Sequence, residues 1–213
     1  MKNVLILFFT WPILFIGQTS TKNSCWKKQS YEKYSHENFS KILEINQTIN
    51  LGKIDYPLLH ATIFFLTNKE RAKRKKKIIS WNKNLEIAAF NHSKMMAELK
   101  FFSHRSKIKK RKEPEDRAKI AGITNPFIAE NIAKTPVNSQ DTYLSLSKKI
   151  VSQWMNSPGH KSNILNKEAL ELGIGVFIIK EREVNYVYST QNFQWYYLTK
   201  CTVSKDSSPP GWK

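Results

Sequence analysis

The chain has 213 residues, of which 40% are hydrophobic and 12% aromatic, and its formal net charge is +18 at neutral pH. This length and composition exclude a disordered chain and predict about one globular domain with a full core. The positive charge would suit an anionic partner, either nucleic acid or a charged surface.

The first 19 residues have the layout of a secretory signal peptide. Lys2 precedes an apolar stretch at residues 4–16, and small and polar residues follow it. The apolar stretch is shorter than a spanning helix requires, so an uncleaved membrane anchor is the less favoured alternative. We therefore expect a secreted or periplasmic protein that is not an integral membrane protein once the signal peptide is cleaved.

Residues 20–55 are polar and show weak periodicity, which predicts a linker or a loosely packed extension. The chain has two cysteines, Cys25 and Cys201, near the two ends of the mature protein. In an oxidising compartment they could form a disulfide that closes a long loop. Pairing requires their Cα atoms within about 7 Å, which the sequence does not fix.

The domain proper is expected over residues 56–203, with a tail at 204–213. A first helix begins near Leu58, and His60 falls between its apolar positions, which predicts a surface or boundary residue. In the second helix His92 lies on an apolar stripe, so we expect a hydrogen-bonded packing residue. A third helix covers about 142–155 and is ended by the following Pro-Gly pair.

Beyond the third helix the pattern changes to that of β-strands. Residues 172–180 form a β-rich apolar run, residues 184–193 alternate, and residues 195–203 offer a further β segment. Helices followed by sequential short strands predict an α+β fold with an antiparallel sheet covered by helices.

Two basic blocks, residues 69–77 and 105–112, carry much of the charge. Aromatic residues that would stack on bases are not interleaved with them, and an exported protein rarely meets nucleic acid, so we expect no nucleic-acid partner. We interpret the blocks as solvated loop faces. Adhesion to anionic cell-envelope polymers is the alternative.

Three ionisable residues, His104, Glu130 and His160, are expected at the ends of elements, where scaffolds present functional groups. They could bind zinc or another divalent transition metal with an open position. They could equally form a metal-free acid–base set in which Glu130 orients an imidazole. Their spacing matches no short metal-binding motif, so we expect no required cofactor and leave both alternatives open.

Seven segments in order resemble the CAP superfamily of cysteine-rich secretory, antigen 5 and pathogenesis-related 1 proteins. The similarity covers about residues 58–193 and is to the bacterial SCP-domain branch. It implies a three-layer α-β-α sandwich with a central antiparallel sheet flanked by helices. The segments are LTNKERAKRKKKIISWNKNLEIAAFNHSKMM, FFSH, DRAKIAGI, AENIA, QWMNSPGHKSNIL, LGIGV and STQNF.

The resemblance implies a central cavity lined by two histidines and two acidic residues. His104 falls on the first histidine and Glu130 on the first acid, whereas Ser157 and Tyr188 replace the second acid and the second histidine. His160 is what the bacterial branch has instead. The family's metal and catalytic proposals are therefore implied only in part.

The favoured function is a secreted binding module that uses this cavity for a small ligand, a lipid or a metal ion. A metal-dependent hydrolase using His104, Glu130 and His160 is the alternative, although no nucleophile motif is present. Adhesion to anionic cell-envelope polymers through the basic loops is the third candidate function. Tyr188 is a supporting residue, and we expect hydrogen bonds to buried backbone around the cavity from Asn131, Asn163, Gln191 and Asn192.

Overall fold

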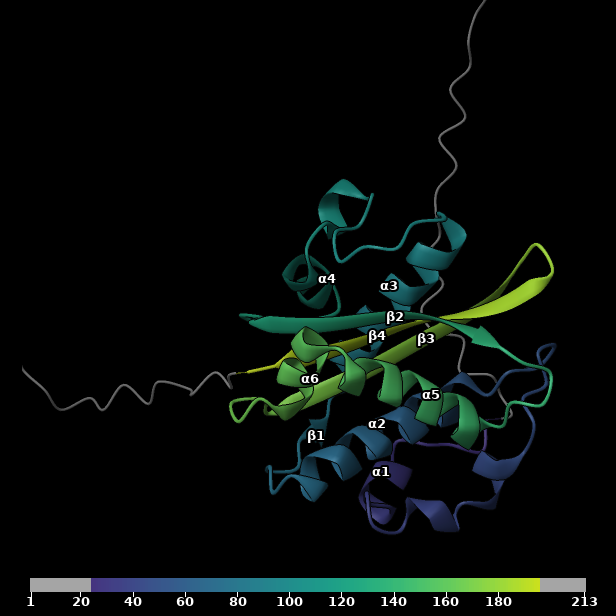
Figure 1. Cartoon of the computed structure of the whole chain (residues 1–213). Helices are drawn as coiled ribbons and strands as arrows, with labels where there is room; N and C mark the ends of the chain where they lie inside the picture. Colours follow the sequence, from purple (N-terminus) through teal and green to yellow (C-terminus); the bar gives the residue numbers. More distant parts are fainter. Residues whose placement is uncertain (1–23, 196–213) are drawn as a thin grey trace, which may run out of the picture.

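The computed structural model describes residues 24–195 and contains one four-stranded sheet in the order β1-β3-β4-β2 (Figure 1). Strands β2, β4 and β3 pair antiparallel, and the two-residue β1 pairs parallel with β3. The antiparallel sheet is confirmed, but the sequence did not predict the parallel edge strand, because two residues show no periodicity. The strands are β1 (Ser80–Trp81), β2 (Ile128–Val137), β3 (Glu171–Glu181) and β4 (Val184–Gln194).

Helices cover both faces of the sheet, which confirms the three-layer α-β-α architecture. In Figure 1, α3 and α4 lie above the sheet, and α2, α5 and α6 lie below it. The helices are α1 (Ser30–Lys33), α2 (Tyr56–Lys73), α3 (Lys83–Glu98), α4 (Pro114–Ile120), α5 (Tyr143–Asn156) and α6 (Pro158–Leu165). Three short 3-10 turns are η1 (Phe39–Lys41), η2 (Leu43–Asn46) and η3 (Lys109–Arg111).

Polar side chains begin the long helices. The carboxylate of Asp55 accepts the Leu58 N–H at the start of α2, and Asn82 caps α3 in the same way. Helix α5 ends before Ser157, as expected from the Pro-Gly pair. Pro158 then begins α6, because a fixed φ and a missing N–H suit the first turn of a helix.

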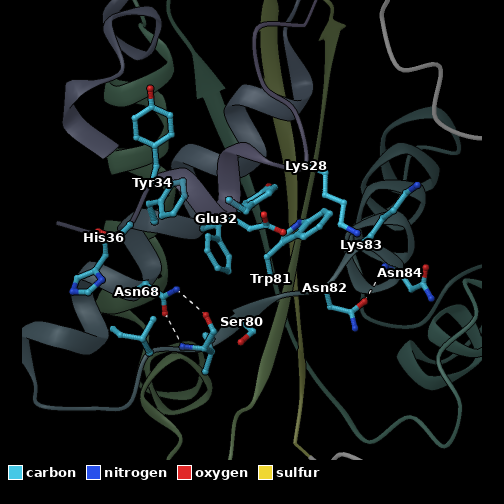
Figure 2. Close-up of a pocket in the computed structure, with 16 residues that line it drawn as sticks. Lys28, Glu32, Tyr34, His36, Asn68, Ser80, Trp81, Asn82, Lys83 and Asn84 are labelled. Carbon is cyan, nitrogen blue, oxygen red and sulfur yellow. Dashed lines mark hydrogen bonds between the residues drawn. The ribbon is translucent and has the colours of Figure 1, made fainter. Parts of the chain in front are cut away.

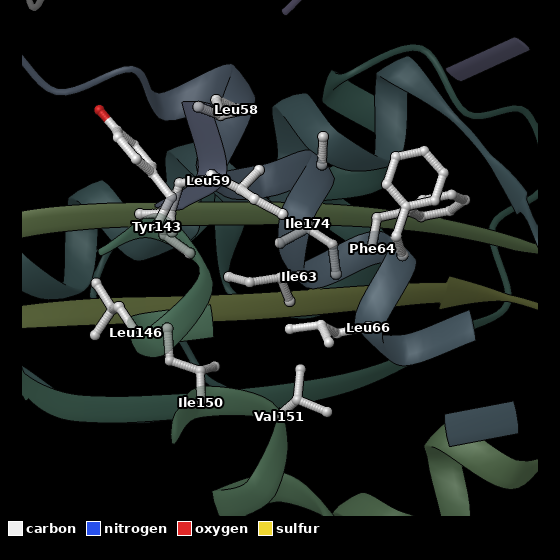
Figure 3. Close-up of a cluster of buried hydrophobic side chains, with 14 of the residues drawn as sticks. Leu58, Leu59, Ile63, Phe64, Leu66, Tyr143, Leu146, Ile150, Val151 and Ile174 are labelled. Carbon is white, nitrogen blue, oxygen red and sulfur yellow. The ribbon is translucent and has the colours of Figure 1, made fainter. Parts of the chain in front are cut away.

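The main core lies between α2, α5 and the lower face of the sheet (Figure 3). It contains Leu58, Leu59, Ile63, Leu146, Ile150, Val151 and Ile174. Helix α2 is buried nearly all round, so the expectation that His60 lies at the surface is wrong. His60 is fully buried and its Nε2 accepts the Val176 N–H at 3.1 Å.

The segment before α2 packs tightly, so the expected loose packing of residues 20–55 is wrong for the part that the structure describes. Trp26, Phe39 and Ile45 are buried in the main core. The ring of Trp26 meets that of Phe65 at 5.6 Å, from outside α2. The apolar residues of this segment are too widely and irregularly spaced to produce a helical or strand pattern, which is why the sequence did not reveal them.

The Ile45→Val substitution is expected to lower the free energy of unfolding by about 1 kcal/mol, because it removes one methylene from a buried side chain. Leu43→Ala in the same 3-10 turn is the control, since Leu43 is 78% exposed and should change stability by less than about 0.5 kcal/mol. Urea unfolding of both variants measures the difference. Equal effects would show that this segment is not part of the core.

Cys25 has no disulfide partner within residues 24–195, and partial burial together with the nearby Asp55 carboxylate raises the pKa of its thiol to about 12. Cys201 lies outside the described residues, so the disulfide stays a prediction. The signal peptide at 1–19, most of the predicted strand at 195–203 and the tail at 204–213 also lie outside them. Within residues 24–195, no helix has the length and apolar character needed to cross a membrane.

Candidate functional site

Glu130 is the centre of a buried polar cluster on the upper face of the sheet. It lies inside β2 rather than at the end of an element, contrary to the expectation from sequence. Its Oε1 is 3.0 Å from Nδ1 of His104, and its Oε2 accepts a hydrogen bond from Nη2 of Arg117 at 2.7 Å. The side chains of Glu130 and Arg117 are each 2% exposed, so the carboxylate does not line an open cavity.

Arg117 ties the second basic block to this carboxylate. It lies in α4, which begins with a reciprocal cap between Glu113 and Asp116. Its Nη1 donates to the backbone carbonyls of Arg111 and Lys112, within that block. The first basic block also has a buried member: Arg71 donates to backbone carbonyls, including that of Ile164 at 2.6 Å. The interpretation of both blocks as solvated loop faces is therefore wrong for Arg71, which is buried.

The carboxylate of Glu130 is ionised at neutral pH. Burial by itself raises its pKa, but the hydrogen bond from His104, the charge that His92 carries when protonated, and the charge and hydrogen bond of Arg117 outweigh burial and hold the pKa below its ordinary value. An ionised carboxylate only accepts hydrogen bonds, so Nδ1 of His104 is the donor. The other ring nitrogen of His104 is left available, and this side chain is 49% exposed.

His92 packs against the cluster from α3. Its Nε2 donates to the Ser103 carbonyl at 3.1 Å and lies 3.7 Å from Oε1 of Glu130, which is the packing role expected of it. Burial lowers the pKa of His92 to about 4, more than the neighbouring Glu130 raises it. His92 is therefore neutral at neutral pH, and Arg117 is the lasting counter-charge of Glu130.

The stability of the protein should rise with pH between about 4 and 6.5, because unfolded His92 binds a proton there and folded His92 does not. His92→Gln, which keeps an N–H donor, should flatten this dependence by up to about 3 kcal/mol. Unfolding curves at several pH values measure it. Parallel curves for the two proteins would contradict the assignment.

His160 lies in the first turn of α6. This helix packs beside β2, the strand that carries Glu130, but on the lower face of the sheet (Figure 1). The backbone carbonyl of His160 accepts from Nδ2 of Asn131 at 3.0 Å, and Asn163 donates to Oδ1 of Asn131 at 2.8 Å. Burial and then the charge of His104 lower the pKa of His160. Within residues 24–195 its Nδ1 has no hydrogen-bond partner. The structure thus joins His104 to Glu130 and holds His160 near them, without a bond to either.

The remaining supporting residues have different surroundings. Gln191 donates to Thr67 at 2.8 Å beneath the sheet, and the buried amide of Asn192 has no hydrogen-bond partner among residues 24–195. Tyr188 is four residues along β4 from the partner of Glu130, and its hydroxyl donates to Glu181 at 2.5 Å. Tyr188 therefore does not stand in for a histidine beside Glu130.

A metal ion does not fit the trio in this arrangement. Oε2 of Glu130 is held by a guanidinium, and Oε1 accepts from His104 Nδ1, so a cation at this carboxylate would lie beside the Arg117 charge and compete with its hydrogen bond. In the described part of the chain, no group of three or more histidine, cysteine, aspartate or glutamate side chains is arranged to hold one. A metal would have to displace Arg117 or bind through the imidazoles alone.

A hollow of about 590 Å³ lies elsewhere, between the segment before α2 and strand β1 (Figure 2). Its aromatic wall includes Trp81, stacked on Tyr31 with ring centroids 4.3 Å apart. At its base Asn68 bonds both backbone polar groups of Ile79. Sequence reasoning missed this hollow because six of its sixteen lining residues come from the segment expected to be loose.

Sequence reasoning also missed Arg117. It is the only arginine of the segment DRAKIAGI, one of those that carried the family resemblance. That segment could have pointed to it, because a carboxylate expected inside a fold needs a partner of opposite charge. In so basic a part of the sequence, however, a buried arginine cannot be told from the solvent-exposed ones beside it.

Comparison with known proteins gives two relatives from Bacillus subtilis (strain 168). The protein YkwD is 36% identical over 110 residues, which cover 52% of this chain and 39% of YkwD. The membrane protein YlbC is 34% identical over 131 residues, 62% of this chain and 33% of YlbC. The chain therefore matches between a third and two fifths of the length of these relatives.

An extracellular protein containing an SCP domain from Bacillus anthracis has a similar structure, with a TM-score of 0.54 and 26% identity over 70% of this chain and 45% of that one. An outer surface protein of Borrelia burgdorferi shares the fold, with a TM-score of 0.50 and 16% identity over 64% of this chain and 92% of that one. The model of the CAP family, the cysteine-rich secretory protein family, matches residues 64–193, which is more than half of the chain. The chain belongs to this family.

Proposed function

We propose that the protein is a secreted binding module that holds a small polar or lipid ligand at the exposed imidazole of His104. The observation that carries the proposal is a row of hydrogen-bonded side chains, Arg117–Glu130–His104. The side chains of Arg117 and Glu130 are buried, and that of His104 is half exposed. The first two side chains have no access to a ligand. Their effect is to fix the ring of His104 and direct its second nitrogen outward.

His160 supports the proposal as a second imidazole at the same edge of the sheet. His160 is partly exposed, and its Nε2, rather than the buried Nδ1, would bond a polar group of a ligand that also contacts His104. An extracellular location is in keeping with that of the similar Bacillus anthracis protein, which is an extracellular protein, and with the predicted signal peptide. It is part of the proposal.

A metal-free hydrolase is the second candidate, favoured by one observation. A carboxylate that orients an imidazole at 3.0 Å is the arrangement used to position a general base. In such an enzyme His104 would activate water, because no motif supplies another nucleophile. The metal-dependent form is less compatible with the guanidinium at Glu130.

Native mass spectrometry of protein purified from the cells that export it tests the proposal. We expect a co-purified small molecule in the wild type that is lost in His104→Ala. His36→Ala is the matched control, because His36 lines the hollow of Figure 2 and should leave the ligand in place. Loss of the co-purified molecule in His36→Ala but not in His104→Ala would show that the ligand binds in the hollow instead. Stoichiometric zinc lost in His104→Ala would instead support the metal site.

A further inference from the structure

A second, small hydrophobic cluster lies on the upper face of the sheet, where the β3–β4 hairpin runs past the end of α3 (Figure 1). It is separate from the main core. Its buried members are Met96, Ala97, Ile132 and Tyr188, and the partly buried rings of Phe101, Phe177 and Tyr186 pack on them.

Two further apolar side chains, in the turn that follows α3, are open to solvent, and the backbone carbonyl of the first of them, Leu99, accepts a hydrogen bond from Lys107 at 3.1 Å. Leu99 is 43% exposed and Phe102 is 50% exposed, with the Phe102 ring 6.4 Å from that of Tyr188. Apolar groups gathered in this way mark an interaction surface more often than single exposed residues do. We call Leu99, Phe101, Phe102, Phe177 and Tyr186, with the lysines beside them, the aromatic–lysine face.

Lysines are interleaved with these rings. Lys94 lies 6.0 Å from the ring centroid of Phe177, and Lys107 lies 5.6 Å from that of Phe101. Lys134 lies 4.5 Å from that of Tyr186. The basic block at 105–112 contains no aromatic residue, but the fold places the ring of Phe101 beside Lys107.

The charge of the face is positive. Glu98 lies 3.7 Å from Lys94, and Glu181 lies 2.7 Å from Lys134, so two of the three lysines have an acidic neighbour. Lys107 forms no ion pair within residues 24–195, and the block at 105–112 adds five further basic residues beside it along the chain, of which Arg105 is paired with Glu113. The face therefore combines one half-exposed ring and several partly buried ones with a positive charge at Lys107 and in the block that contains it.

We propose that the aromatic–lysine face docks the protein on a lipid bilayer that carries anionic headgroups. Exposed leucine and phenylalanine side chains are favoured at the water–lipid interface, and lysines are attracted to acidic headgroups. A soluble polyanion would neutralise the lysines but leave Leu99 and Phe102 in water. The proposal does not depend on a ligand at His104, although docking would bring His104 close to the lipid surface.

Flotation with vesicles tests it. The probe is phosphatidylcholine with about one third phosphatidylglycerol, compared with phosphatidylcholine alone, and the protein is the exported form without the predicted signal peptide. We expect binding to the anionic vesicles that weakens with salt and is weak on neutral vesicles. No binding to anionic vesicles, or equal binding to both, would overturn the proposal.

Two pairs of substitutions identify the face. Leu99→Ser with Phe102→Ser keeps the charge and should weaken vesicle binding about tenfold, while binding to soluble polyphosphate is unchanged. Lys94→Gln with Lys107→Gln should weaken vesicle binding about tenfold or more. Lys76→Gln with Lys77→Gln removes the same charge from exposed positions of the other basic block and should have little effect.

Thermal unfolding verifies that each variant is folded, and all of them share one N-terminus, so differences report on the substituted side chains. Equal losses in the two lysine pairs would show attraction by net charge alone and overturn the assignment to this face. Unchanged vesicle binding in the Leu99→Ser, Phe102→Ser variant would do the same and would favour an anionic polymer as the partner.

Discussion

Arg117→Met is expected to lower the free energy of unfolding by about 3 to 5 kcal/mol. The substitution leaves the buried Glu130 carboxylate, 2% exposed, without its guanidinium partner, and removing one partner of a buried ion pair has a cost of this size. It also removes the donor to the Arg111 and Lys112 carbonyls, which loosens the adjoining basic block. Urea unfolding at neutral pH measures the change.

Two variants control this prediction. Arg105→Met removes an exposed ion pair, between Arg105 and Glu113 at 2.8 Å, and should change stability by less than about 1 kcal/mol. Adding Glu130→Gln to Arg117→Met removes the buried charge and should recover part of the loss, because the two side chains are coupled. An Arg117→Met effect no larger than that of Arg105→Met would contradict the buried pair.

Gly175→Ala is expected to destabilise the fold by about 3 kcal/mol or more. A Cβ at this position of β3 would lie 1.9 Å from the backbone nitrogen of Phe90, so α3 would have to move away from the sheet. The displacement would also stretch the hydrogen bond from Ser93 to the Gly175 carbonyl, now 2.8 Å. Thermal or urea unfolding measures the loss.

Gly159→Ala is the matched control for this change. Gly159 lies in α6 with no atom within 4 Å of the added Cβ, so the variant should be neutral or stabilised by up to about 1 kcal/mol. If Gly175→Ala were tolerated as well as Gly159→Ala, the close approach of α3 to β3 would be wrong.

The layers of the fold were predictable from sequence because their signals are local and periodic. The apolar stripe containing His92 and the alternation in residues 184–193 correspond to α3 and β4. His104 was also found, since it follows a helix end. The segment before α2 was misjudged, because the burial of Trp26 and Phe39 depends on a surface of α2 that no local pattern reveals.

The site was only partly predictable for a similar reason. Glu130 and His104 are 26 residues apart, and the family resemblance, rather than any spacing, brought them together. Arg117 was missed because a buried arginine and a solvated one look the same in a basic sequence. The short helix α6 was also missed, because Pro158 was interpreted only as the end of α5.

A histidine-selective long-range ¹H–¹⁵N NMR spectrum tests the central claim most directly, that Glu130 fixes the ring of His104 with its second nitrogen outward. At about pH 8, where histidines are ordinarily neutral, we expect His104 to be the tautomer protonated at Nδ1 in the wild type. Glu130→Gln should remove this preference. A wild-type His104 protonated at Nε2 would contradict the account.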